Sequence, residues 1–163
     1  MKTAIRIVLA LATVGGGFAG VLAAANGFWT TSVNDSRLLA LLWLSVLMYS
    51  AITIAGLMFV ISARVGRVLM MATASMVPWI DLPGIKYHLT SVLYTAITFG
   101  PPHGSGKIGT YIEWSSQLGS QFQFRIGGSP DGDWSLGINL FAVLLVILSS
   151  IYKQLMPIRV SDS

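Results

Sequence analysis

The feature that most constrains this chain is an uncharged apolar run from Leu38 to Ile61. The run holds 24 residues without a formal charge and is bounded by Arg37 and by Arg64 and Arg67. A helix over it would be about 36 Å long, which is enough to cross a bilayer with some tilt. A soluble helix of this length is not apolar on every face. We therefore predict a transmembrane helix over residues 38–61.

The charge content indicates that lipid is the solvent for much of the surface. Charged residues make up 10% of the 163 residues and apolar residues 54%, whereas soluble domains average about 25% charged residues. The net charge of +4 does not indicate nucleic acid, because the basic residues never cluster beyond a pair. The absence of cysteine excludes disulfides and thiolate metal sites. We predict no nucleic-acid partner and no cofactor.

The first apolar segment, residues 7–25, follows the basic residues Lys2 and Arg6. A signal peptide has the same layout, and Ala23-Ala24-Ala25 would suit its cleavage site. The apolar stretch of 19 residues is longer than the usual signal core. We therefore favour a retained transmembrane helix, with the cleaved signal peptide as the alternative.

Small residues recur every four positions in this first segment, at Ala12, Gly16, Gly20 and Ala24. On a helix they form one seam, which lets another backbone approach closely. We expect this helix-packing seam to lie against a helix of the same chain, with another subunit as the alternative. Gly17 lies about 100° around the helix from Gly16 and is therefore off this seam. We therefore expect Gly17→Leu to disturb packing less than Gly16→Leu or Gly20→Leu.

Two further spans complete the predicted fold. Residues 65–80 give a short span of about 24 Å that ends near Pro78, and residues 136–155 give a span rich in Leu, Val and Ile. The sequence thus predicts an all-α integral membrane protein with four transmembrane helices. Residues 1–163 would form a single membrane domain, and residues 81–135 would form an extracytoplasmic excursion.

Basic residues and tryptophans suggest an orientation. With both termini in the cytoplasm, Lys2, Arg6, Arg64, Arg67, Lys153 and Arg159 lie inside, in agreement with the positive-inside rule. Trp29, Trp79 and Trp134 then fall at the outer interface as anchors. A three-span chain with a cytoplasmic connector is the alternative, since charge counting barely separates the two. We expect a multi-pass protein of a cell membrane, of the bacterial inner-membrane type.

The connector contains strand patterns but no convincing motif. Residues 121–126 alternate polar and apolar side chains, and residues 110–114 are a plausible partner strand, so we expect a small β-hairpin with its turn at 115–120. Residues 104–109 match G-x-G-x-x-G without a preceding strand, which indicates a loop. His88 and His103 lack metal-ligand spacing, and Asp131-Gly132-Asp133 is typical of a turn.

The helices predicted here hold no ionisable group near the bilayer centre, which argues against an autonomous coupled pump. We expect a non-catalytic accessory or scaffold subunit of a larger membrane complex, with the lipid bilayer and other membrane subunits as partners. The alternative is an oligomeric channel or facilitator for a small uncharged solute, with the glycine-rich first helix lining the path. An enzyme using Asp81, His88 and Glu113 is a third reading.

Overall fold

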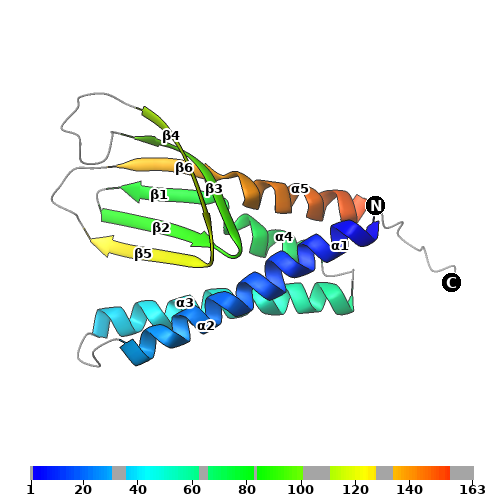
Figure 1. The fold of residues 1–163 in the computed structure, drawn as a ribbon, viewed down its shortest axis with the longest axis horizontal. Coiled ribbons are helices and arrows are strands. Elements are labelled where there is room, and N and C mark those ends of the chain that lie inside the picture. Colours follow the sequence, from blue (N-terminus) through cyan, green and yellow to red (C-terminus); the bar gives the residue numbers. More distant parts are fainter. Residues whose placement is uncertain are drawn as a thin grey trace, which may run out of the picture.

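The computed structural model describes residues 2–30, 36–62, 66–82, 84–100, 111–127 and 134–154 (Figure 1). The helical elements are α1 (Lys2–Ala10), the π-helical turn η1 (Leu11–Gly15), α2 (Gly16–Thr30), α3 (Ser36–Ile61), α4 (Gly66–Ala74) and α5 (Leu140–Gln154). The strands are β1 (Pro78–Leu82), β2 (Gly84–Thr90), β3 (Leu93–Gly100), β4 (Tyr111–Leu118), β5 (Gln121–Gly127) and β6 (Ser135–Asn139).

The predicted all-α fold with four transmembrane helices is wrong, because six strands form a curled antiparallel sheet in the order β4-β3-β6-β1-β2-β5. Among the described residues, two helices are long and apolar enough to cross a membrane, Lys2–Phe28 and Ser36–Ile61. These two correspond to the predicted segments 7–25 and 38–61. Long uncharged runs of this kind favour a helix, because a helix forms all its backbone hydrogen bonds within one segment.

The predicted spans 65–80 and 136–155 each divide into a short helix and a strand. The helix α4 ends at Ala74, and Pro78, which has no N–H to continue a helix, opens β1. At the other site, β6 ends at Asn139, whose side-chain oxygen accepts hydrogen bonds from the backbone N–H groups of Phe141 and Ala142. Asn139 therefore acts as the N-cap of α5.

The predicted β-hairpin is also wrong in its pairing. Both strands exist, as β4 and β5, and only Gly119 and Ser120 separate them along the chain. However, β4 pairs with β3 and β5 pairs with β2, so β4 and β5 lie at opposite edges of the sheet. Long-range pairing has replaced the local hairpin.

The two long helices form an antiparallel hairpin that runs the length of the molecule (Figure 1). One half of the hairpin packs with α4 and α5, and the other half extends beside the sheet. The sheet meets the hairpin near its middle, where the hydroxyl group of Tyr49 donates a hydrogen bond to the Thr90 carbonyl at 2.9 Å. Close by, the Ser120 hydroxyl donates to the Gly16 carbonyl at 3.0 Å.

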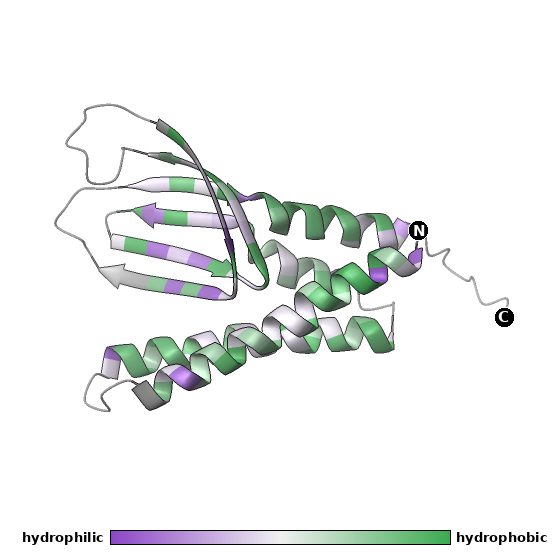
Figure 2. Ribbon diagram, viewed as in Figure 1, coloured by the Kyte–Doolittle hydropathy of each residue, from purple (hydrophilic) through white to green (hydrophobic). Residues whose placement is uncertain are grey.

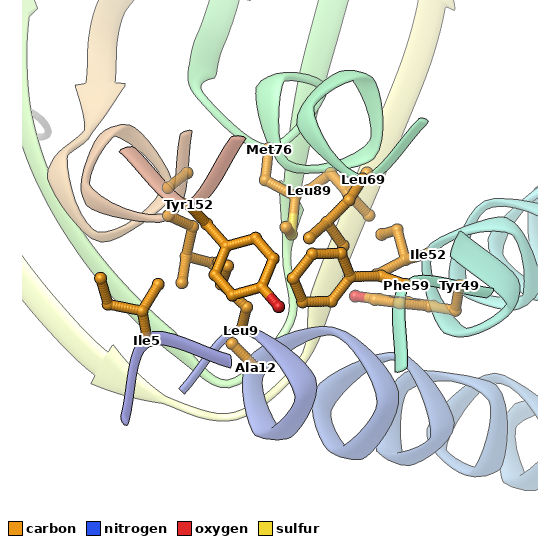
Figure 3. Packing of buried hydrophobic residues seen from close by; sticks show 12 residues of the cluster. Ile5, Leu9, Ala12, Tyr49, Ile52, Phe59, Leu69, Met76, Leu89 and Tyr152 are labelled. Carbon is orange, nitrogen blue, oxygen red and sulfur yellow. The ribbon is translucent and has the colours of Figure 1, made fainter. Parts of the chain in front are cut away.

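The buried core lies where the hairpin and the short helices meet one end of the sheet (Figure 3). We call this end, which carries the β2–β3 and β4–β5 turns, the closed end of the sheet. The rings of Phe59 from α3 and Tyr152 from α5 meet edge to face, with centroids 5.0 Å apart. The other core residues labelled in Figure 3 are Ile5, Leu9, Ala12, Tyr49, Ile52, Leu69, Met76 and Leu89.

Candidate functional site

The two faces of the sheet differ sharply in chemistry. Residues directly opposite each other in an antiparallel pair share a face, and alternate residues of one strand point to opposite faces. Trp79 lies opposite both His88 and Gly137, and Asp81 lies opposite Lys86. These residues therefore share one face, which we call the inner face.

The inner face is the concave one. His88 of β2 and Tyr94 of β3 belong to strands that have two other strands between them, which is about 14 Å in a flat sheet. Their ring centroids nevertheless lie 4.9 Å apart, so the sheet must curl around them. Trp79 completes the group, with its ring centroid 4.0 Å from that of His88 and 5.1 Å from that of Tyr94. We call Trp79, His88 and Tyr94 the aromatic cluster.

Gly137 of β6, which lies opposite Trp79, packs closely against β3. A Cβ atom at Gly137 would lie 2.6 Å from the Ile97 carbonyl oxygen and 2.7 Å from Cγ2 of Thr98. A side chain at residue 137 would therefore clash with β3. The indole N–H of Trp79 donates to the Ser135 hydroxyl at 3.1 Å, and the Tyr94 and Ser115 hydroxyl oxygens lie 2.7 Å apart.

His88 is the most unusual member, because its side chain is 1% exposed and neither ring nitrogen has a hydrogen-bond partner in the structure. Burial, together with the positive charge of Lys86, lowers the pKa of His88 to about 4. The ring is therefore neutral at pH 7. A histidine with this pKa is a weak general base, so the geometry is that of a packed aromatic group.

Two charged residues of the inner face, Asp81 and Lys86, lie two positions along their strands from Trp79 and His88. Lys86 Nζ lies 2.8 Å from Asp81 Oδ2 in a half-buried cross-strand ion pair. Asp81 and His88 were two of the three residues considered for an enzyme site, and they lie on one face of the sheet. The side chain of the third, Glu113, lies outside the described part. Within the described residues, no group of three or more metal-ligating side chains comes together.

The small residues of the predicted seam are all buried, but they do not face one neighbour. A Cβ atom at Gly16 would meet Val92 and Ser91 of the turn between β2 and β3, whereas one at Gly20 would lie 2.3 Å from Cδ1 of the Tyr49 ring. The expectation for Gly17 was wrong. A Cβ atom there would lie 2.4 Å from Thr53 Oγ1 and 3.0 Å from the Thr53 backbone nitrogen, so Gly17 is as confined as its neighbours.

The three tryptophans expected to be interfacial anchors lie in different surroundings. Trp79 lies inside the curled sheet rather than at a helix end. Trp134 directly precedes β6, with its ring 5.7 Å from that of Phe99. Trp29 lies in the last turn of α2, and its side chain is outside the described part.

Several sequence predictions fall outside the described residues. These are the loop at 104–109, His103 and the Asp131-Gly132-Asp133 turn. Conversely, sequence analysis did not single out Tyr94. Its signal, a tyrosine alternating with the small residues Ala96 and Thr98 on one face of β3, becomes informative only once the pairing is known.

Comparisons of the chain with protein-family models, with curated proteins and with solved structures found no match.

Proposed function

We propose that the chain is a membrane-anchored, non-catalytic accessory subunit, held in the bilayer by the hairpin of α1–α2 and α3. The observation that carries this proposal is the hairpin's exposed apolar surface. Large apolar side chains point away from the protein along both helices, although water would disfavour such a surface. They include Leu11, Phe18, Leu22, Trp43, Leu47 and Ile54.

Charges at the hairpin ends support a cytoplasmic N-terminus. Lys2 and Arg6 lie in α1, at the end of the molecule that holds the N-terminus (Figure 1), and Arg67 lies in the first turn of α4, which begins at Gly66, five residues after the end of α3 at Ile61. The Arg6 guanidinium also donates a hydrogen bond to the Val60 carbonyl near the end of α3. Positive charge concentrates on the cytoplasmic side of membrane proteins. The sheet then lies toward the extracytoplasmic side.

Packing within the chain favours a scaffold role over the channel alternative. Three of the glycines that would line a path in the first helix, Gly16, Gly17 and Gly20, are covered by the protein itself. Tyr49 and Thr53 of α3 lie against Gly17 and Gly20, and the turn between β2 and β3 lies against Gly16. In the sheet, Trp79 and Tyr94 lie against the His88 ring. These contacts support a rigid structural unit whose outer surfaces are available for association.

The test is to isolate the full-length chain from native membranes in a mild detergent and measure the mass of the particle. We expect the chain to resist extraction by alkaline carbonate and to migrate in a complex larger than its own mass plus detergent. A stable lone monomer would contradict the accessory-subunit role. Release by carbonate would contradict membrane anchoring.

A further inference from the structure

The outer face of the sheet, opposite the aromatic cluster, is apolar over most of its area. Its residues follow from the register, since Ile97 lies opposite Ile138 and Trp114, and Phe99 lies opposite Leu136 and Ile112. Ile112, Trp114 and Leu118 of β4 are 75%, 64% and 78% exposed. We call Ile97, Phe99, Ile112, Trp114, Leu118, Leu136 and Ile138 the outer wall.

Another part of the same face is covered by the protein's own helices. Leu89 on β2 is fully buried in the core, and Tyr87 and Phe122 pack against that core. The Tyr87 hydroxyl also donates to the Ser75 carbonyl just after α4. The face therefore meets apolar neighbours on the β2–β5 side, whereas every residue of the outer wall on the β3–β4–β6 side is exposed, even where Trp134 lies beside Phe99.

Charge is distributed in the opposite sense. The ionisable side chains described in the sheet, apart from the tyrosines, are Asp81, Lys86 and His88, and the register places all three on the inner face. A sheet with polar groups inside its curl and apolar groups outside has the polarity of a barrel wall that contacts lipid. In Figure 2 the strands alternate between hydrophilic and hydrophobic residues, whereas the helices are mostly hydrophobic.

The contact between sheet and hairpin fixes the depth of the outer wall. Gly16, which meets the turn between β2 and β3, has fourteen helical residues on either side of it. Tyr49, which bonds to Thr90, has thirteen residues of α3 before it and twelve after it. Both contacts are thus at the midpoints of the candidate spans. From there the strands run toward the end where α2 stops and α3 starts (Figure 1).

We propose that the outer wall lies in the bilayer, with lipid acyl chains of one leaflet packed against β3, β4 and β6. This proposal rests on the proposed membrane anchoring of the hairpin. Leu118 lies near the closed end of the sheet, close to the bilayer centre, and Ile112 lies about 20 Å further along β4, near the headgroups. A shallow hollow lined by Ile97, Phe99, Leu136, Ile138 and Leu140 joins the wall to α5. The apolar surface continues along α5 at Leu144, Ile147 and Ile151.

Backbone groups in lipid need partners, and the turn between β4 and β5 provides some of them. The free edges belong to β4 and β5, which the residues Gly119 and Ser120 join at the bilayer centre. There the Gly119 N–H donates to the Val92 carbonyl at 2.8 Å, and the Gln121 N–H donates to the Thr90 hydroxyl at 3.0 Å. The interior strands of the wall, β3 and β6, are paired on both sides.

The experiment uses nitroxide spin labels on single cysteines in the full-length chain, reconstituted in phosphatidylcholine–phosphatidylglycerol vesicles. The chain has no cysteine of its own, so the background is clean. Labels at Leu118→Cys and Ile138→Cys should collide several-fold more with oxygen, which concentrates in lipid, than with a water-soluble nickel chelate. Ile112→Cys should show more nickel access than Leu118→Cys. Gln117→Cys, one residue from Leu118 and on the opposite face, is the matched control and should lack the lipid pattern.

Leu47→Cys on the exposed surface of α3 separates the two proposals. If Leu47→Cys collides mainly with nickel, the membrane anchoring itself is wrong. If Leu47→Cys shows the lipid pattern but Leu118→Cys and Ile138→Cys collide mainly with nickel, the hairpin is anchored and the outer wall lies in water. Protection of these two labels from both reagents would show that protein covers the wall, which also overturns the inference. Circular dichroism of each labelled variant establishes that the fold is retained.

Discussion

The ring of Tyr49 lies directly against Gly20, so that a Cβ atom on Gly20 would come within 2.3 Å of Cδ1 of Tyr49. The same tyrosine donates its hydroxyl hydrogen to the Thr90 carbonyl at 2.9 Å. Tyr49 therefore connects three elements: it fills the space that Gly20 leaves in α2, it belongs to α3, and it bonds to the end of β2. Tyr49 is thus one of the residues that join the sheet to the hairpin, together with Ser120, which bonds to Gly16.

Gly20→Ala should destabilise the protein by about 1–3 kcal/mol, because the added methyl group forces the Tyr49 ring out of its packed position. Gly15→Ala is the matched control, since a Cβ atom there has nothing within 4 Å. That change should be neutral or stabilise the helix by roughly 0.5–1 kcal/mol, since alanine is the better helix former. Denaturant titration in detergent measures both variants. Equal midpoints for Gly20→Ala and Gly15→Ala would contradict the close contact.

The strand order can be tested by disulfide formation. Thr95 of β3 lies opposite Ser116 of β4, and their hydroxyl oxygens are 3.2 Å apart. Opposite residues in antiparallel strands have Cα atoms about 4.5–5.5 Å apart, which suits a disulfide. The pair Thr95→Cys/Ser116→Cys should therefore oxidise readily, as a mobility shift on a non-reducing gel. The pair Ser116→Cys/Gln123→Cys would be opposite in a hairpin closed by Gly119 and Ser120, and it should not oxidise. The reverse result would restore the local hairpin.

The sequence identified the two long helices because each has an uncharged run that leaves few other conformations. It failed at residues 65–80, because a short apolar run fits a helix or a buried strand equally well. Strands β2 and β3 were not predicted, because Lys86 and His88 interrupt the apolar pattern. These two residues lie on the polar inner face, which exists only after the sheet curls. The aromatic cluster brings together Trp79, His88 and Tyr94 from three strands. No spacing along the chain reveals that contact, because it depends on long-range pairing and on the curl of the sheet.

Acid should destabilise the fold through His88. The pKa of His88 is about 4 in the folded protein, against 6.5 for an unperturbed histidine. As pH falls, the unfolded chain therefore takes up the proton first. The contribution of His88 to stability is complete above pH 6.5 and is lost progressively between pH 6.5 and 4. The loss is at most about 3 kcal/mol. Unfolding midpoints measured across this range should decline for the natural chain and for a His103→Ala control. His88→Phe, which keeps a ring in the cluster, should lose this decline. A decline of the same size in this variant would show that another group is responsible.

The orientation of the hairpin can be measured with two exposed positions at its opposite ends. Thr3 lies in the first turn of α1, close to Lys2 and Arg6, and Ser36 opens α3 beside Arg37. Because basic residues are retained on the cytoplasmic side, the end that carries Lys2, Arg6 and Arg67 should lie inside. In intact cells, Ser36→Cys should therefore react with a membrane-impermeant thiol reagent, whereas Thr3→Cys should react only after the membrane is opened. The opposite pattern would invert the hairpin and place the sheet toward the cytoplasm. Labelling of both positions in intact cells would mean that the first helix does not cross the membrane, because the two ends of a spanning helix cannot be on one side.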